Sequence, residues 1–223
     1  MTSRPRRIAL RLIITVAALV LWFWTQALLG ARPAQPSAIG DGLHRLTASA
    51  NACFHVHPRA ADALLIVSSA LIDALALFLL LRWLFGTTVR PFLGLVLLLV
   101  LRQSMQALCA LPPPPGMIWH YPGVPSLLVT YSVSSDFFFS GHTAIAVFAA
   151  TELARLRKPW LTFLGIVIAL FEIGAIIVLR AHYTMDVFTG ILAALCVAAF
   201  VERLSSPIDH LLGHASSPAP PSH

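Results

Sequence analysis

Charged residues are scarce in this sequence: they make up 11% of its 223 residues, whereas hydrophobic residues make up 58%. A soluble domain of this length cannot bury that much apolar surface, because interior volume is limited by the size of the chain. Lipid is the alternative solvent, and a run of about 20 apolar residues is long enough to cross it. The composition therefore predicts an integral membrane protein.

Further shortages exclude other classes of protein. The net charge of +6 is not gathered into a basic stripe, since most basic residues flank apolar runs, and this argues against nucleic-acid binding. The three cysteines, Cys53, Cys109 and Cys196, have no spacing typical of a metal or redox site. Lys158 is the only lysine, which hints at a GC-rich genome and favours a bacterial inner membrane as the location.

Six apolar segments predict an all-α, polytopic membrane protein, a bundle of six transmembrane helices. At a rise of 1.5 Å per residue each segment is about 27–36 Å long, enough to cross the hydrocarbon core. Residues 1–204 are expected to form a single catalytic domain, and residues 205–223 a disordered cytoplasmic tail rich in Ser, Pro and His. The segments are expected near Ile8–Leu29, Asp62–Phe85, Phe92–Leu111, Phe137–Ala154, Trp160–Leu179 and Met185–Leu204.

The positions of arginine and lysine predict the orientation. With the N-terminus inside, ten basic residues fall on the inner side and three in the outer loops, a clear positive-inside bias. Both termini are therefore expected in the cytoplasm. Two sizeable loops, residues 31–61 and 112–136, then lie outside, and the prolines and glycines of the first are expected to prevent regular structure there.

Two polar clusters fall on this outer face, at the starts of the fourth and sixth segments. They are Ser140-Gly-His-Thr143 and His182-Tyr-Thr-Met-Asp186. Each lies at a helix N-terminus, where unpaired backbone N–H groups attract anions, and a glycine lets a phosphate approach the backbone closely. His182 and Asp186 are four residues apart, so on a helix they share one face and can hydrogen-bond.

Each cluster by itself has a simpler interpretation. A single histidine at the end of a span is usually an interfacial residue, and a single serine there is a common N-cap. Together, however, the clusters supply a pair of imidazoles, a carboxylate and anion-binding helix ends on one face of the membrane. That combination predicts a site for phosphoryl transfer.

The clusters also resemble the motifs of a known family. The stretch Asp136-Phe-Phe-Phe-Ser-Gly-His-Thr143 resembles the Gly-Asp-x-x-x-Ser-Gly-His-Thr motif of the sphingomyelin synthases, and His182-Tyr-Thr-Met-Asp186 resembles their His-Tyr-Thr-x-Asp motif. Arg102 followed by Leu111-Pro-Pro-Pro114 is similar to the family's Arg…Leu-Pro-x-Pro segment. The resemblance covers roughly residues 95–204, with the motifs in 102–186. The family belongs to the type 2 phosphatidic acid phosphatase superfamily.

The resemblance implies a catalytic triad of His142, His182 and Asp186. His182 would be the nucleophile that forms a phosphohistidine, and His142 would protonate the leaving alcohol and then deprotonate the acceptor hydroxyl. The reaction would move a phospho-head group from a glycerophospholipid to ceramide or another lipid alcohol at the outer face, without metal or organic cofactor. The supporting residues that it suggests are Asp136, Thr143 and Tyr183.

Ser140, Gly141, Arg102 and Arg180 are expected to bind the substrate phosphate, with Arg180, at the membrane face, the better clamp. Arg102 lies inside its span, as do Asp73 and Glu172. It is either a phosphate clamp or the ion-pair partner of one of these carboxylates.

The function has two alternatives to head-group transfer. If water attacks the same intermediate, the protein is a lipid phosphate phosphatase or a phospholipase C-like hydrolase. The other alternative is a membrane protein that kept the fold without catalysis.

The role of the aromatic residues near the motifs also stays open. They form either a cage for a quaternary ammonium group or an interfacial anchor, and they are Trp119, Tyr121 and Phe137–Phe139. The sequence does not indicate an oligomeric state.

Overall fold

The computed structural model describes residues 4–31, 39–132 and 137–211, and every regular element in these ranges is a helix. The all-α prediction is confirmed for this part of the chain. The helices are α1 (Arg4–Gly30), α2 (Gly42–Leu46), α3 (Ala48–Val56), α4 (Pro58–Phe85), α5 (Arg90–Leu108), α6 (Gly141–Ala154), α7 (Pro159–Val178) and α8 (Thr184–Leu211).

Proline marks the start of three of the long helices. Pro58, Pro91 and Pro159 lie in the first turns of α4, α5 and α7. A proline costs nothing at this position, because its missing N–H would have no partner within the helix. These residues therefore fix where the helices begin without interrupting the apolar runs that follow.

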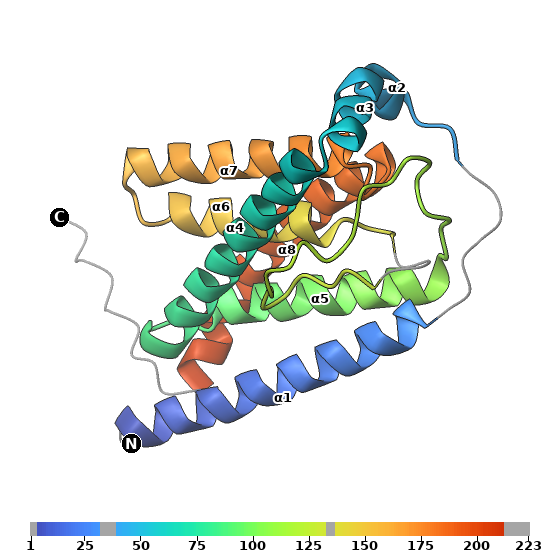
Figure 1. The fold of residues 1–223 in the computed structure, drawn as a ribbon. Helices are drawn as coiled ribbons and strands as arrows, with labels where there is room; N and C mark the ends of the chain where they lie inside the picture. Colours follow the sequence, from blue (N-terminus) through green and yellow to red (C-terminus); the bar gives the residue numbers. More distant parts are fainter. Residues whose placement is uncertain (1–3, 32–38, 133–136, 212–223) are drawn as a thin grey trace.

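The helices form one bundle, with the small helices at one end (Figure 1). The α6 helix packs against both α7 and α8, α4 and α5 complete the bundle, and α1 lies along its edge. The α2 and α3 helices lie at the end of the bundle where α5 ends, and the loop that follows α5 runs from there back toward the middle of α4. The start of α1 and the end of α8 lie at the opposite end.

Five helices, α1, α4, α5, α7 and α8, are long and apolar enough to cross a membrane. The fourth predicted segment is the exception. Ser140 caps α6, so the helix begins at Gly141 rather than Phe137 and has 14 residues. This corresponds to about 21 Å of helix, less than the roughly 30 Å of the hydrocarbon core. The count of six spans is therefore not confirmed, although α6 lies in the centre of the bundle.

Two other expectations need correction. The outer loop 31–61 contains α2, α3 and the first turn of α4, because Asp41 caps α2 by accepting the backbone N–H of His44. The α8 helix continues to Leu211, beyond the expected start of the tail at residue 205. Asp209 on this extension accepts hydrogen bonds of 2.7 Å from the backbone N–H of Val89 and the hydroxyl of Thr88, which attaches it to the start of α5.

Candidate active site

The first polar cluster forms the start of α6. Ser140 is the N-cap and is fully buried: its hydroxyl oxygen accepts hydrogen bonds from the Thr143 backbone N–H at 3.3 Å and the Thr143 hydroxyl at 3.0 Å. Gly141 and His142 follow in the first turn, and both line a cavity. Ser140 and Thr143 therefore hold each other at the cap, while Gly141 exposes bare backbone to the cavity.

The second cluster is not a single helical face. Because α8 begins at Thr184, His182 precedes the helix and Asp186 lies in its first turn. Asp186 Oδ2 accepts a 2.9 Å hydrogen bond from the backbone N–H of Tyr183 and lies 3.7 Å from His182 Nδ1. This second separation is an ion-pair contact, too long for a hydrogen bond. The two side chains meet, but through the turn before α8 rather than through helical spacing.

Backbone contacts join the two clusters. The N–H of Ser140 donates a 3.1 Å hydrogen bond to the carbonyl oxygen of Asp186. Gly190, one turn further along α8, allows the close approach, since a Cβ atom there would lie 2.8 Å from the Ser140 carbonyl oxygen. The start of α6 is thus fixed against the start of α8, and residues some 40 positions apart in the chain share one site.

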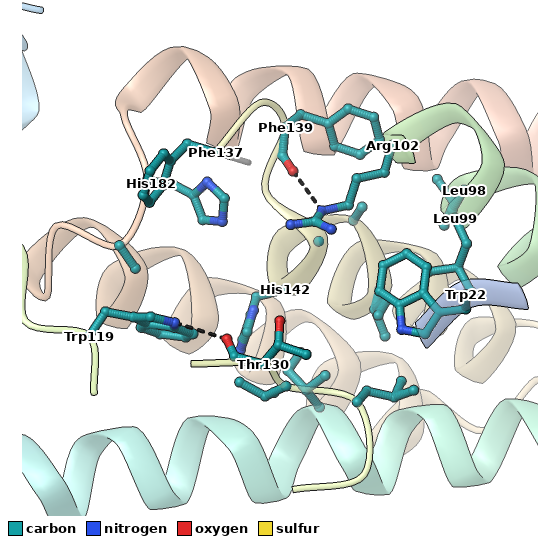
Figure 2. Close-up of a pocket in the computed structure, with 17 residues that line it drawn as sticks. Trp22, Leu98, Leu99, Arg102, Trp119, Thr130, Phe137, Phe139, His142 and His182 are labelled. Carbon is teal, nitrogen blue, oxygen red and sulfur yellow. Dashed lines mark hydrogen bonds between the residues drawn. The ribbon is translucent and has the colours of Figure 1, made fainter. Parts of the chain in front are cut away.

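Both histidines line the same cavity, together with the guanidinium of Arg102 (Figure 2). His142 and His182 are largely buried, with 9% and 7% of their surface exposed. The cavity holds about 60 Å³, room enough for a small polar group. Much of its lining is apolar and includes Trp22, Ile72, Leu98, Leu99, Leu128 and Ile145.

Arg102 reaches the cavity from α5, and three of its hydrogen bonds go to neutral oxygens. Its Nε donates to the Phe139 carbonyl at 3.1 Å, and its Nη1 donates to the amide oxygens of Gln26 at 3.1 Å and Gln106 at 3.2 Å. The guanidinium packs over Gly141, where a Cβ atom would be 3.1 Å from Nε. It therefore lies across the N-terminus of α6, beside His142.

The two carboxylates considered as partners of Arg102 have hydrogen bonds elsewhere. Asp73 accepts from the hydroxyl of Ser126 and from the backbone N–H groups of Leu127 and Leu128, at 2.7–3.0 Å. Glu172 accepts a 2.6 Å hydrogen bond from the hydroxyl of Ser68. Asp73 thus fixes the loop after α5 to α4, and Glu172 joins α7 to α4. Among the described residues, neither of these two carboxylates pairs with Arg102.

Arg180 does not line the cavity. Its guanidinium donates to the carbonyl oxygens of Pro115 at 2.6 Å and His44 at 3.3 Å, so it fastens the proline-rich loop and α2 to the end of α7. The sequence ranked Arg180 above Arg102 as the phosphate clamp, but Arg102 lines the cavity and Arg180 does not. Depth along a span does not indicate the direction of a long side chain, which depends on tertiary packing.

Three of the five aromatic residues considered as a cage line the cavity: Trp119, Phe137 and Phe139. Trp119 lines the cavity, donates its Nε1–H to the Thr130 carbonyl at 3.1 Å, and packs edge-on against His142 with ring centroids 5.4 Å apart. Phe137 packs edge-on against His182 at 6.2 Å. Tyr121 is 57% exposed and contacts Tyr131 instead. The aromatic rings at the cavity thus buttress the two imidazoles.

The remaining predicted support residues lie outside the cavity or outside the described residues. Tyr183 is buried beside it, with its ring stacked on His44 at 5.8 Å and its hydroxyl 3.5 Å from the Pro113 carbonyl oxygen. Asp136 falls among residues 133–136, outside the part of the chain that the structure describes.

Sequence reasoning missed two residues that hold the histidine turn. Asp41 accepts hydrogen bonds of 2.6 Å from both the backbone N–H and the hydroxyl of Thr184. His44 Nε2 lies 3.0 Å from the carbonyl oxygen of His182, and hydrogen-bonds to it when that nitrogen carries the proton. The only signal in the sequence was that Asp41 is a good N-cap residue. Nothing local linked it to a segment more than 140 residues away.

Comparison with known proteins adds one finding. Residues 41–203 match the family model AtPDCT1/2, a family of phosphatidylcholine:diacylglycerol cholinephosphotransferases. The match covers more than two thirds of the chain and includes both polar clusters, while α1 lies outside it. No curated protein and no solved structure matches the chain.

Proposed function

The chain belongs to the AtPDCT1/2 family of lipid head-group phosphotransferases, and from this we propose that it moves a phosphocholine-type head group from a glycerophospholipid to a diacylglycerol-type lipid alcohol. The observation that carries the proposal is that two imidazoles from separate segments and one guanidinium line a single cavity. Such a site can attack phosphorus, transfer a proton and bind phosphate oxygens without further groups.

In the first half of the proposed reaction, His182 is the nucleophile. Its Nδ1 faces Asp186 at 3.7 Å, which leaves Nε2 for the attack on phosphorus. The carboxylate stabilises the positive charge that develops on the ring, as in other histidine–aspartate pairs. The bond between phosphorus and the glyceride oxygen breaks, and His142 donates a proton to that oxygen, so that a diacylglycerol leaves and a phosphohistidine remains.

In the second half, the acceptor lipid enters and His142 removes the proton from its hydroxyl. The acceptor oxygen attacks phosphorus, the phosphorus–nitrogen bond breaks, and His182 is regenerated. Arg102 and the backbone N–H groups at the start of α6 hold the phosphate oxygens in both halves. The packing of Trp119 and Phe137 against the two rings keeps the imidazoles oriented and limits the access of water.

The proposed site lies at the outer membrane face. Figure 1 has α2, α3 and the histidine segment at the end of the bundle away from the start of α1. Most basic residues outside the spans flank that opposite end of the bundle, which the positive-inside rule assigns to the cytoplasm. Donor and acceptor lipids would then both come from the outer leaflet.

A mass-shift exchange assay tests this function. The purified full-length protein in detergent is given phosphatidylcholine with a labelled head group and a diacylglycerol of different acyl mass. Transfer produces labelled phosphatidylcholine with the new acyl chains. Free phosphocholine would instead indicate a hydrolase, and no turnover would indicate a protein without catalysis. Ceramide as a parallel acceptor tests the predicted resemblance to the sphingomyelin synthases.

The same assay tests the nucleophile. His182→Ala is expected to abolish both turnover and an acid-labile phosphoenzyme, because the attacking nitrogen is removed. The matched control is His55→Ala, which removes an exposed imidazole on α3 and is expected to leave turnover unchanged. Turnover that survives in His182→Ala would overturn the assignment of the nucleophile.

A further inference from the structure

The α1 helix differs from the other helices in how it is buried. Most of its large apolar side chains are exposed, as expected for a helix that faces lipid. Only four of its described residues are buried, namely Arg11, Thr15, Trp22 and Gln26. Their spacing of four, seven and four residues puts them on one helical face, toward the bundle. Three of the four are polar, which is unusual for the buried face of a membrane helix and calls for polar partners.

The inner pair of these residues has a structural role. Arg11 Nη1 donates to the carbonyl oxygens of Trp83, Leu84 and Gly86 at 2.7–3.2 Å, and so caps the C-terminal end of α4. Thr15 donates its hydroxyl to the carbonyl of Arg11 one turn earlier. These contacts attach α1 to the bundle but involve no group at the cavity.

The outer pair reaches the cavity. Gln26 Oε1 accepts hydrogen bonds from Arg102 Nη1 at 3.1 Å and from Gln103 Nε2 at 3.5 Å. The Trp22 ring lines the cavity, and the Arg102 guanidinium carbon lies 5.7 Å from its centroid, within the range of a cation–π contact. Figure 2 shows the Trp22 ring on the side of the cavity where Arg102 enters.

Neutral groups suit this position chemically. An amide oxygen and an aromatic face orient a guanidinium without adding a negative charge, whereas a carboxylate in the same place would compete with a phosphate for it. Gln26 is only 4% exposed, so its amide oxygen cannot exchange Arg102 for bulk water. The family match begins at residue 41 and so does not cover either side chain.

From these contacts we propose that α1 is part of the phosphate-binding site: Gln26 is a positioning residue that aims Arg102 at the substrate phosphate, and Trp22 forms the wall behind it. The inference rests on the proposed function in taking the phosphate of a lipid head group as the ligand. It adds α1 to the site, beside α5, which carries Arg102, and the segments that carry the two histidine motifs.

Two substitutions at one position separate positioning from mere support. Gln26→Ala removes the acceptor, and Gln26→Glu keeps an acceptor oxygen but adds a negative charge beside the guanidinium. The inhibition constant of inorganic phosphate, the KM for the phosphatidylcholine donor and the thermal unfolding temperature are measured for each. The matched control is Thr25→Ala, whose hydroxyl bonds only to carbonyls of its own helix.

We expect Gln26→Ala to raise the phosphate inhibition constant and the donor KM about tenfold, the size of one hydrogen bond to a charged group. Gln26→Glu is expected to weaken phosphate binding further while keeping or raising the unfolding temperature, since it retains the contact with Arg102. Thr25→Ala should stay within about twofold of wild type. A purely structural role predicts the same intact stability for Gln26→Glu, but with phosphate binding unchanged.

The outcomes distinguish this inference from the function on which it rests. Phosphate and phosphocholine are also tested by the rise that they cause in the unfolding temperature, which needs no turnover. An inactive wild type with a phosphate-induced rise that Gln26→Glu abolishes would overturn the proposed function and support the inference. Unchanged phosphate binding in Gln26→Glu would overturn the inference, and this holds even if Gln26→Ala does not fold.

Discussion

Both carboxylate oxygens of Asp41 accept hydrogen bonds from Thr184, one from its backbone N–H and one from its hydroxyl, each at 2.6 Å. The same carboxylate caps α2 through the backbone N–H of His44. Asp41 therefore joins the first turn of α2 to the first turn of α8. Its partner on α8, Thr184, comes two residues after His182. The turn that carries His182, the nucleophile that we propose, is therefore fixed by Asp41 as well as by Asp186.

The first prediction concerns the turnover rate, which we expect to depend on the contacts between Asp41 and Thr184. Asp41→Ala frees the start of α8 and is expected to lower kcat about tenfold or more, because small displacements of a reacting group cost rate steeply. The loss of a helix cap should also lower stability by about 1 kcal/mol. The exchange assay and thermal unfolding measure the two effects. Arg45→Ala, an exposed position on α2, is the control, and an equal loss there would contradict a specific role for Asp41.

The second prediction is a pH dependence. Burial raises the pKa of Asp41, but the hydrogen bonds from Thr184 and His44 outweigh it and hold the pKa below the ordinary value of 3.8. A depressed folded-state pKa means that this stabilisation is complete well above pH 4 and is lost as the pH falls through the folded pKa. The difference in unfolding temperature between wild type and Asp41→Asn should therefore be constant above about pH 5 and shrink below about pH 4. If the difference in unfolding temperature between wild type and Asp41→Asn stays unchanged down to pH 3, the depressed pKa of Asp41 would be contradicted.

Asp186 is the subject of the third prediction. Asp186→Asn keeps an oxygen that can accept the Tyr183 N–H but removes the charge that faces His182 Nδ1. We expect normal folding and a loss of about 10²–10⁴ in kcat, the range seen when a histidine loses its orienting carboxylate. Steady-state kinetics beside a thermal unfolding curve measures this. A loss of less than tenfold would mean that the turn alone orients the imidazole.

The bundle was predictable because its signals are local. Each of the six apolar segments overlaps a helix, and five of these helices are long and apolar enough to cross a membrane, since length and hydropathy determine which segments partition into lipid. The motif residues His142, His182 and Asp186 were found from residue type and order: both histidines line one cavity, and Asp186 contacts His182. The catalytic roles of these residues stay predictions until they are tested.

What the sequence did not reveal depends on tertiary packing. The α2 helix has only five residues and no apolar run, yet it carries Asp41 and His44 to the histidine turn. The positions of the Arg102 and Arg180 guanidinium groups depend on which carbonyl and amide oxygens the fold brings within reach. The helix start at Gly141 depends on the cap at Ser140, because a hydropathy window cannot detect a single hydrogen-bonding hydroxyl.

The fourth prediction compares two glycines. A Cβ atom at Gly190 would lie 2.8 Å from the Ser140 carbonyl oxygen, whereas one at Gly174 on α7 would meet nothing within 4 Å. Gly190→Ala is expected to push α8 away from the start of α6, with a cost of about 1–3 kcal/mol and loss of activity. Gly174→Ala should be neutral or stabilising by up to about 1 kcal/mol, because alanine favours the helix. Full activity in Gly190→Ala would show that the contact can relax.

The fifth prediction concerns the opposite end of the bundle. Arg90 and Glu152 form an ion pair of 3.2 Å with side chains only 5% and 2% exposed, whereas Arg155 and Glu202 form an exposed pair nearby. Glu152→Ala removes one of the two carboxylates that pair with the buried Arg90 guanidinium, which keeps Glu202 at 3.3 Å, so it should cost about 1–3 kcal/mol. For a chain of this size that corresponds to roughly 2–12 °C in the unfolding temperature.

Arg155→Ala is the matched comparison, because it breaks an ion pair that water already solvates and should cost no more than about 1 kcal/mol. Thermal unfolding in detergent measures both variants. Since the pair of Arg90 and Glu152 is remote from the cavity, the fraction of Glu152→Ala that remains folded should keep its donor KM. A raised donor KM with unchanged stability would mean that the Arg90–Glu152 pair affects the geometry of the histidine site. Burial of this ion pair would then need a functional explanation rather than a structural one.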